Sequence, residues 1–423
     1  MKSVLFLPLC ALLHFSLASS CSGGLRPSPS SESYIQIALS NNPNIKAARA
    51  KWEAMKKRVP QEKAWDDLMA GVDLQRTNTT RLDKVTDAEY MLSQALPISG
   101  KNLSRGRAAM AEALGAYEEL RRTELDVVNR VQGAYYRLAG AYGQLEITKS
   151  NQALLKDLSE ISRRKNEVGT AMQSDVLLAQ TELARLSENV AMIQRDISDQ
   201  ESQLNVLMNH PANAPIATPS PLEFKSPAKS QSESLAIAEK LRPEILIALR
   251  QTEASKARLQ LARRQWIPDP QLQIKARQFS GTSGIQEYDT GVFMSIPWAN
   301  PVKYTAGVQE ANGTLASSQH QLEAARVEVA GMVRDQFKKI ETFASNYRLF
   351  HDQIMPTAQL AVKSTRAGYE TDKNTFLELI TAQRSMQEIE SSALTQLVEH
   401  QAAIAELEAL IGSTTYLPNP EHP

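Results

Sequence analysis

The chain has 423 residues, of which 42% are hydrophobic and 6% aromatic, and its 47 Lys and Arg residues balance 47 Asp and Glu residues. This length allows two or three domains or one large repeat architecture. The balanced charge argues against a protein that binds nucleic acid by electrostatic attraction, because phosphate neutralisation requires a basic surface. Both cysteines lie in the first 21 residues, so the rest of the chain has no disulfide and no cysteine-based metal site.

Residues 1–20 have the pattern of a secretory signal, in which a positive residue precedes a short apolar run and small residues precede Cys21. The segment Leu17-Ala18-Ser19-Ser20-Cys21 resembles the lipobox of bacterial lipoproteins, and this resemblance predicts an acyl group on Cys21. Ordinary signal cleavage that leaves a free thiol is the alternative. A Ser/Pro/Gly-rich tether then extends to residue 33. No later segment has the ~18 consecutive apolar residues that a membrane-spanning helix needs.

In the first half of the chain, the sequence predicts a short helix (residues 42–63), two strands (66–77 and 87–98), a very long helix (101–168) and a medium helix (170–209). Asn42 is a favourable cap for the short helix, and Pro43 suits its first turn. The long helix contains no proline and would extend for ~100 Å. The medium helix carries apolar residues in sevens, which is typical of a coiled-coil seam. Because the short and medium helices together nearly match the long one in length, we expect them to lie end to end beside it.

The second half repeats this order, with strands at residues 271–277 and 288–296, a helix at 302–371 and a helix at 373–412. An offset of 200 aligns Pro43 with Pro243 and Pro97 with Pro297, and an offset of 203 aligns Ala179-Gln180 with Ala382-Gln383. Pro356 predicts a kink in the second long helix. The predicted domains are a signal peptide (residues 1–20), a tether (21–33), a first repeat (34–209), a linker (210–232), a second repeat (233–412) and a tail (413–423).

The strands alternate between two kinds of side chain. In residues 288–296, the apolar face is formed by Tyr288, Thr290, Val292, Met294 and Ile296. One face is therefore compatible with lipid and the other with water. Four strands with open edges leave backbone groups unsatisfied in lipid, so closure requires other copies of the chain. A trimer would supply twelve strands, within the range of membrane barrels. We thus predict a mainly α fold with a small β part: two internal repeats of long helical hairpins that build a helical barrel, and four strands per copy in a trimeric β-barrel.

The sequence resembles the TolC-type outer-membrane efflux protein family along nearly all of the mature chain. The segments that carry the resemblance are Ala38-Leu39-Ser40-Asn41-Asn42-Pro43, Gln94 to Lys101, Val168-Gly169-Thr170, Asp175 to Gln180 and Phe376 to Arg384. The Gly100-Lys101 junction and the last of these segments are most similar to the heavy-metal-type branch.

The resemblance implies a passive duct that extends from the outer membrane into the periplasm and is anchored by a lipid on Cys21. Its implied partners are two further copies of itself, outer-membrane lipid, a periplasmic adaptor (membrane fusion) protein and an inner-membrane pump of the RND type. The implied cargo includes metal ions, although drugs or a polypeptide remain alternatives. A second hypothesis for function is a periplasmic structural coiled-coil lipoprotein without channel activity.

By the same resemblance, the turns between the long and medium helices form the periplasmic tip and contact the adaptor. These turns contain Val168, Gly169, Thr170, Thr371, Asp372 and Lys373. Acidic residues near this end are candidates for a gate that attracts cations, namely Asp175, Glu370 and Asp372. Helix-end electrostatics is the alternative, with Asp175 at a helix start and Asp372 as an N-cap. Alignment of the repeats places Asp372 where the first repeat has Gly169, a departure from the glycine that is common in the family.

No catalytic motif is present, because the six histidines are scattered and there is no phosphate-binding glycine loop and no nucleophile elbow. We predict no enzymatic activity, no catalytic residue, no metal site and no cofactor. The histidines in the helices are expected on helix surfaces or in seams between helices. Four tryptophans flank the strands and suit either an interfacial aromatic belt or packing at the helix-to-strand transition, at positions 52, 65, 266 and 298. Arg105 and Arg107 suit a solvated helix face or a position at lipid headgroups.

Overall fold

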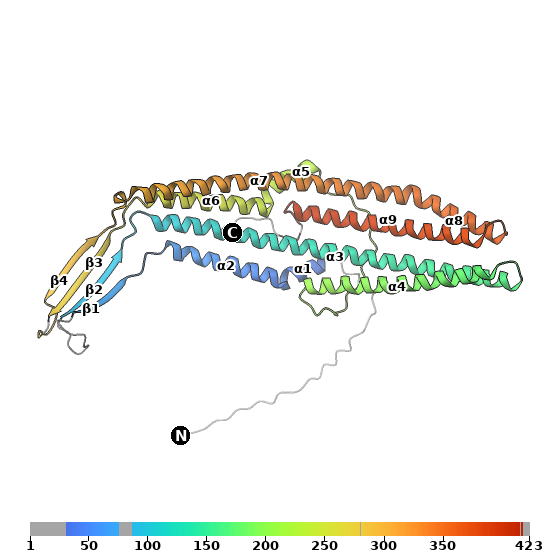
Figure 1. The fold of residues 1–423 in the computed structure, drawn as a ribbon, viewed down its shortest axis with the longest axis horizontal. Helices are drawn as coiled ribbons and strands as arrows, with labels where there is room; N and C mark the ends of the chain where they lie inside the picture. Colours follow the sequence, from blue (N-terminus) through green and yellow to red (C-terminus); the bar gives the residue numbers. More distant parts are fainter. Residues whose placement is uncertain (1–30, 76–86, 280, 415, 418–423) are drawn as a thin grey trace, which may run out of the picture.

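The computed structural model describes residues 31–75, 87–279, 281–414 and 416–417. The molecule is long and narrow, with a β-sheet at one end and two helical hairpin turns at the other (Figure 1). Mainly helical architecture with a small sheet agrees with the prediction. Within the described residues, no helix is both long and apolar enough to cross a membrane.

The start of the first repeat contains two helices where one was predicted. Helix α1 (Ser31–Asn41) precedes α2 (Pro43–Lys63), and the predicted tether is wrong at its last residues because α1 begins at Ser31. Pro43 cannot donate a backbone hydrogen bond to α1, so the chain breaks there. The predicted cap is confirmed, because the Asn42 side chain accepts a hydrogen bond of 2.9 Å from the Asn44 amide.

Helix α3 (Lys101–Glu167) is the axis of the first repeat. Helices α1 and α2 pack on its first half, and α4 (Gln173–Leu207) packs on its second half, so they lie end to end as predicted (Figure 1). The hydrophobic core between them includes Tyr34 and Ile35 from α1, Leu138 from α3 and Leu204 from α4. The medium helix is two to three residues shorter at each end than predicted, since the turn takes up those residues.

The second repeat follows the same plan. Its helices are α5 (Gln231–Leu241), α6 (Pro243–Arg264), α7 (Pro301–Arg348), α8 (Met355–Glu370) and α9 (Phe376–Leu410). Helix α5 begins inside the predicted linker. The predicted single helix of residues 302–371 is interrupted by a π-helical segment, Leu349–Ile354. Its cause is Pro356, which lacks a backbone N–H and whose ring would collide with the carbonyl of Asp352 in a regular α-helix.

The strands form one antiparallel sheet in the order β1-β2-β3-β4, at Met69–Gln75, Asp87–Ala95, Gln271–Phe279 and Glu287–Phe293. The fourth strand ends before the predicted residue 296, because a short 3-10 turn, Pro297–Ala299, follows. The pairing places Val72, Tyr90, Ala276 and Tyr288 in one row across the sheet. Val72 is 59% exposed and Tyr288 71% exposed, so the apolar face of the sheet is uncovered in a single chain.

The opposite face of the sheet is charged. One row across its strands consists of Asp73, Glu89, Arg277 and Glu287. Arg277 lies 2.8 Å from Glu89 and 3.3 Å from Glu287, and Lys275 from the next row lies 2.6 Å from Glu89. The two faces therefore differ as the sequence predicted.

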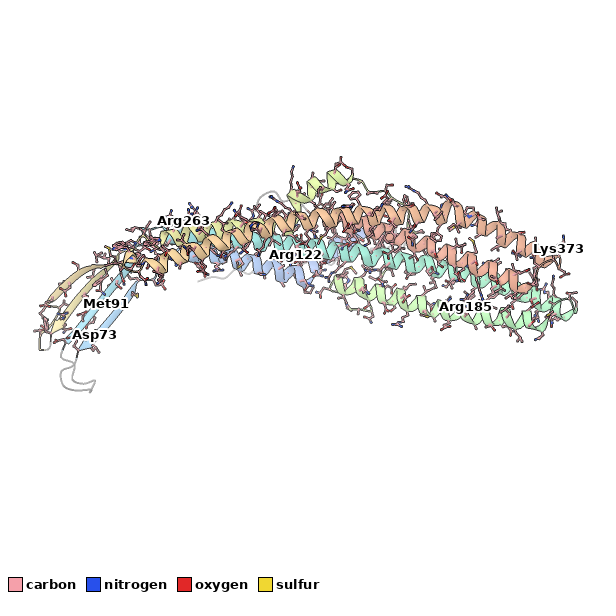
Figure 2. All side chains as sticks on the ribbon, turned by 45° about the horizontal axis from the view of Figure 1, so that its top comes forward. Asp73, Met91, Arg122, Arg185, Arg263 and Lys373 are labelled. Carbon is pink, nitrogen blue, oxygen red and sulfur yellow. The ribbon has the colours of Figure 1, made fainter. Side chains whose placement is uncertain are left out.

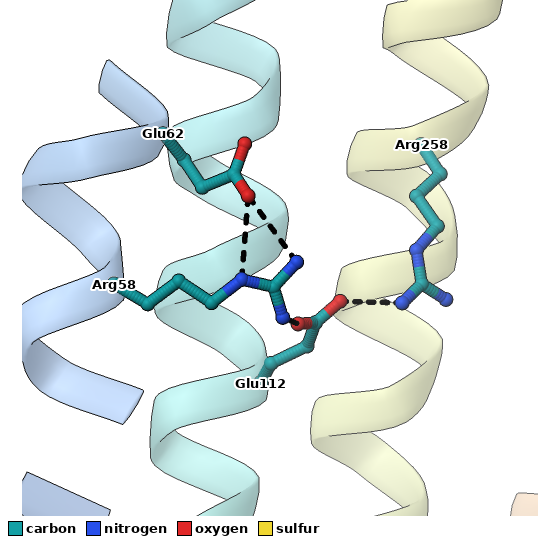
Figure 3. Close-up of polar contacts among 4 residues, drawn as sticks. All are labelled: Arg58, Glu62, Glu112 and Arg258. Carbon is teal, nitrogen blue, oxygen red and sulfur yellow. Dashed lines mark hydrogen bonds and ion pairs between the residues drawn. The ribbon is translucent and has the colours of Figure 1, made fainter. Parts of the chain in front are cut away.

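Ion pairs connect the two repeats close to the sheet. The carboxylate of Glu112 on α3 lies between Arg58 of α2 and Arg258 of α6 (Figure 3). Arg58 Nη1 is 2.9 Å from Glu112 Oε2, and Arg58 also pairs with Glu62 one turn along α2 at 3.2 Å. Three helices from two repeats thus share one charged cluster on an otherwise solvated surface.

The linker between the repeats packs against α9 through His400, which is completely buried. The His400 Nε2 atom lies 2.9 Å from the carbonyl oxygen of Lys225, and its ring stacks on Phe224 at 4.6 Å. Gln401 Nε2 donates to the carbonyl oxygen of Glu223 at 2.9 Å. His400 therefore occupies a seam, as predicted, and His320 and His351 lie on helix surfaces.

Candidate functional site at the hairpin turns

The α3–α4 turn and the α8–α9 turn lie together at the end of the molecule farthest from the sheet (Figures 1 and 2). The predicted tip residues occupy these turns. Val168, Gly169 and Thr170 follow α3, and Thr371, Asp372 and Lys373 follow α8. The structure thus brings the two predicted triplets to the same end, although they are about 200 positions apart in the chain.

The two turns have the same backbone hydrogen bonds. The Thr170 amide donates to the Lys165 carbonyl at 2.8 Å, and the Lys373 amide donates to the Gly368 carbonyl at 2.8 Å. The remaining bonds of each turn also match at the offset of 203 between the repeats. The two turns are therefore copies of one structure.

Replacement of glycine by aspartate does not change the backbone of the second turn. Gly169 has φ 80° and Asp372 has φ 59°, so both residues are in the left-handed region. Asp is one of the few residues other than Gly that adopts this region, because its short polar side chain finds local partners. Asp372 therefore departs from the glycine of the family in its side chain, while the main chain keeps the left-handed conformation.

The carboxylate of Asp372 is held by Lys165 from the other repeat. Lys165 Nζ lies 2.7 Å from Asp372 Oδ1 and donates a second hydrogen bond of 2.7 Å to the Tyr369 carbonyl. The ammonium group also lies 4.6 Å from the centre of the Tyr369 ring. Lys165 is thus a clamp between the two hairpins, with a side chain only 19% exposed.

No sequence pattern distinguishes Lys165. A basic residue in the last turn of a helix is ordinary, because it interacts favourably with the helix dipole. The equivalent residue of the second repeat is Gly368, whose absent Cβ would lie 1.6 Å from Asn374 Oδ1. The clamp is therefore a feature of the contact between repeats, and comparison of the repeats with each other gives no signal for it.

The other gate candidates stay within their own hairpins. Glu370 pairs with Arg366 one turn earlier on α8, at 3.1 Å. Asp175 lies in the first turn of α4, where its charge favours the helix dipole. Among the described residues, no ion pair holds Asp175, so of the three candidates only Asp372 forms an ion pair with the opposite hairpin.

The alternative role of Asp372 as an N-cap is wrong, because the cap of α9 is Thr375. Thr375 and Glu378 form a reciprocal capping box, in which the Thr375 amide donates to Glu378 at 2.9 Å. This backbone hydrogen bond, with a second from the Asn374 side chain, lowers the pKa of Glu378. In α4 the equivalent cap residue is Met172, which makes no such bond. The start of α9 is therefore fixed more firmly than the start of α4.

The first turn also exposes apolar side chains. Val168 is 74% exposed and Met172 is 73% exposed, and Leu177 follows on α4 at 54%. Uncovered apolar residues at a narrow tip are typical of a surface that contacts another protein. The α3–α4 turn is thus suited to a partner, and at the α8–α9 turn Leu377 is likewise 59% exposed at the start of α9.

Above the turns, the hairpins share a core and an ion pair whose carboxylate is buried. Leu155 and Leu158 of α3 pack with Phe376 and Ile380 of the second repeat. Glu182 of α4, which is 4% exposed, pairs with Arg384 of α9 and with Arg185. The clamp at Lys165 therefore lies at the end of a continuous contact between the two hairpins.

The family model for outer membrane efflux proteins matches the chain twice, over residues 34–210 and 235–413. The chain belongs to this family. The predicted resemblance is confirmed, and each match covers one of the two repeats. The assignment to the heavy-metal-type branch remains a prediction.

Individual relatives agree with the family. TtgC of Pseudomonas putida, a probable efflux pump outer membrane protein, is 21% identical over 379 residues, which are 85% of this chain and 78% of TtgC. AprF of Pseudomonas aeruginosa, an alkaline protease secretion protein, is 23% identical over 384 residues, 83% of this chain and 77% of AprF. The crystal structure of CusC superposes with a TM-score of 0.78 at 18% identity, covering 92% of this chain and 93% of CusC.

Two further expectations concern residues and ligands outside the tip. Cys21, the predicted lipidation site, lies outside the described residues. In the part of the chain that the structure describes, no three His, Cys, Asp or Glu side chains gather as metal ligands would.

Proposed function

We propose that this protein is the outer-membrane channel component of a tripartite efflux or secretion system. The observation that carries the proposal is the match of the family model to both repeats. The channel is passive, because the chain has no nucleotide-binding motif and the family resemblance assigns the energy source to an inner-membrane pump.

The sheet supports a trimeric channel. Within the described residues, β1 and β4 each pair on one side only, so the sheet has two open edges. Lipid around the apolar face offers no hydrogen bonds to such edges. Three copies joined edge to edge form a closed barrel of twelve strands, with the row Asp73, Glu89, Arg277 and Glu287 toward the water-filled lumen.

The turns are the proposed docking surface for a periplasmic adaptor. Val168, Gly169 and Thr170, together with the exposed Met172, form one part of this surface, and Thr371, Asp372 and Lys373 form the other. Through the adaptor, the channel connects to an inner-membrane pump, which we propose to be of the RND type.

The cargo is set by the pump. Relatives are named for solvents, antibiotics and a protease, so the relatives do not favour metal ions over the other classes.

The clamp between Lys165 and Asp372 is the proposed latch of the closed tip. Release of the ion pair frees the second hairpin from the first at its end, and widening of the tip follows. Asp175 and Glu370 are proposed to contribute to a ring of carboxylates around the threefold axis, which attracts cations.

Conductance measurements test the channel. Full-length protein reconstituted in planar bilayers should form pores whose conductance rises when the tip is released. If no pore forms, even in the Glu370→Gln, Asp372→Asn double variant, the channel is contradicted and a structural coiled-coil lipoprotein is favoured.

Acylation of Cys21 is proposed independently, and mass spectrometry of the mature N-terminus decides it against a free thiol.

A further inference from the structure

Exposed apolar side chains are concentrated where the strands join the helices. Every one of the four junctions has them, namely Trp65, Leu68, Ile98, Leu103, Ile267, Met294, Ile296, Trp298 and Val302. Trp298 is 59% exposed and Val302 74% exposed. They continue the uncovered apolar face of the sheet toward the helices. Such a band marks a contact with a large apolar partner.

The basic residues at the same junctions fall into two groups. Those of the first group are occupied inside the chain: Lys101 pairs with Asp269 at 3.0 Å, and Arg264 Nη1 donates to the Ser99 carbonyl at 2.6 Å. Together with the Ser99 hydroxyl, which donates to Asp269 at 2.8 Å, they fix the angle between sheet and helices. These cations are therefore structural.

The second group is exposed and has no ion pair among the described residues. Arg263 lies in the last turn of α6, at the end of the helices next to the sheet (Figure 2), and Lys303 lies in the first turn of α7. Arg107 is also exposed, and its single hydrogen bond is to the neutral amide of Gln260 at 3.3 Å. Their charges are available to a partner.

An aromatic pair joins the two chain segments that carry Arg263 and Lys303. The rings of Trp266 and Tyr304 are 5.5 Å apart, and both residues are half-buried. Lys303 Nζ lies 5.6 Å from the centre of the Tyr304 ring, and Arg263 precedes Trp266 by three residues. Amphipathic rings flanked by Lys and Arg are the side chains that anchor proteins at the headgroup level of a membrane.

We propose that Arg263 and Lys303, on the two segments joined by the Trp266 and Tyr304 rings, bind the phosphate of an anionic phospholipid in the leaflet that faces the helices. This inference rests on the proposed insertion of the sheet in the outer membrane. A lipid fits better than a free phosphate ion because Lys303 directly follows the exposed Val302, and the exposed Trp298 lies at the same junction, so an acyl chain has apolar side chains to cover. Arg107 on α3 adds a further positive charge that attracts anionic headgroups to the same junction.

Quenching of tryptophan fluorescence tests the site, since Trp65, Trp266 and Trp298 all lie at the junctions. Full-length protein is reconstituted in vesicles that contain brominated phosphatidylglycerol or brominated phosphatidylcholine, and the ratio of their relative binding constants is measured. We expect the wild-type protein to prefer phosphatidylglycerol, on the order of fivefold per available cation. The Arg263→Gln, Lys303→Gln double variant should lose most of this preference.

A matched control uses Arg334→Gln, Lys363→Gln, which removes two exposed cations of α7 and α8 that have no ion pair in the described structure. The control should keep the preference, and high salt should weaken it in the wild type. An unchanged ratio in the junction variant, or competition by excess inorganic phosphate, overturns the lipid site. Conductance in the same vesicles separates the two proposals, because pores without a lipid preference contradict only this site.

Discussion

Lys165 Nζ lies 2.7 Å from Asp372 Oδ1, and this contact joins the ends of two hairpins that belong to different repeats. The same ammonium group bonds the Tyr369 carbonyl at 2.7 Å and lies over the Tyr369 ring. Exposed ion pairs contribute about 0–1 kcal/mol. Here the lysine is mostly buried and has three partners, so the contact is held better than an isolated pair on the surface.

The first prediction concerns release of this clamp. Lys165→Gln and Asp372→Asn should each raise single-channel conductance, because either change removes the charge attraction that keeps the hairpins together. A double-mutant cycle, measured on the free energy of unfolding, should give a coupling energy of about 1 kcal/mol between the two residues. Asn tolerates positive φ, so Asp372→Asn changes the charge without adding backbone strain.

Arg163→Gln is the control for charge, since Arg163 pairs with Glu167 on the same helix and both are largely exposed. Conductance should stay at the wild-type value in this variant. Equal conductance in all four proteins would show that the clamp does not restrain the tip.

The second prediction separates backbone from side chain in the first turn. Gly169 has φ 80°, and a Cβ at this position would meet no atom within 4 Å. Gly169→Ala should therefore destabilise the turn only by the left-handed strain, about 1–2 kcal/mol. Gly169→Pro requires φ near −65° and removes the amide that donates to Asn166 at 3.0 Å, so export should be abolished.

Trimers and membrane insertion should persist in Gly169→Pro, because the main hydrophobic core, around Leu138 and Leu204, lies far from the turn. Chemical cross-linking and conductance measure the two properties separately. Loss of trimers in this variant would mean that the turn is part of the assembly and not of its opening.

The third prediction uses the crowded glycine of the second hairpin. A Cβ on Gly368 would lie 1.6 Å from Asn374 Oδ1 and 3.2 Å from Asn374 Cβ. Gly368→Ala should therefore force the Asn374 side chain out of its position and strain the turn, whose Lys373 and Asn374 amides donate to the Gly368 carbonyl, so the clamp weakens and conductance rises. Adding Asn374→Ala, which copies Ala171 of the first repeat, should restore wild-type conductance. Failure of this rescue would contradict the steric explanation.

The secondary structure of this chain could be predicted from the sequence to a large degree. The long helix at Lys101–Glu167, the four strands and the end-to-end arrangement follow from periodicity, prolines and element lengths. Alignment of the repeats also placed Asp372 at the position of Gly169, and both residues have positive φ. These features depend on residues that are close together in the chain, so the sequence is enough to predict them.

Features that depend on distant contacts could not be predicted. Lys165 and Asp372 are 207 positions apart, and nothing in the sequence around Asp372 indicates a lysine of the other repeat as its partner. Helix α1 was missed because its eleven residues are too short for a clear period, and its stability comes from packing Tyr34 and Ile35 on α3. Pro356 predicted a kink, but only the packed structure shows that a π-helical segment accommodates it.

The fourth prediction concerns pH. Burial raises the pKa of Glu390 above its ordinary value of 4.5, and the hydrogen bond from Asn151 only partly opposes this. The folded protein therefore holds this proton more tightly than the unfolded chain does. The resulting stability is fully present below pH 4.5 and is lost as pH rises through the folded-state pKa.

Glu390→Gln keeps the size and the hydrogen bond with Asn151 but does not ionise. Its stability relative to the wild type should increase between pH 4.5 and pH 8, as measured by urea midpoints at both values. Glu388→Gln, on the exposed side of α9, should show no such change. If the Glu390 variant and the wild type respond to pH in parallel, burial of this carboxyl does not affect folding.

The fifth prediction concerns the reach of a lipid on Cys21, which lies outside the described residues. Cys21 is ten positions before Ser31, and an extended chain spans about 3.5 Å per position, so the reach is about 35 Å. Helices α1 and α2 have 11 and 21 residues and run end to end toward the sheet, which places Ser31 about 48 Å from the end of α2. With α1 folded, an acyl group on Cys21 thus falls short of the membrane that the strands would cross.

Acylation and docking of α1 should therefore compete. We expect acylated protein in membranes to exchange the amide hydrogens of Tyr34 and Ile35 at least tenfold faster than Cys21→Ala protein, because unwinding α1 adds the missing length. Exchange at Val128 of α3, which packs in the same core, is the internal control for global stability. Equal protection of α1 in both proteins, with the lipid verified by mass spectrometry, would show that the strands do not lie in the membrane that holds the lipid.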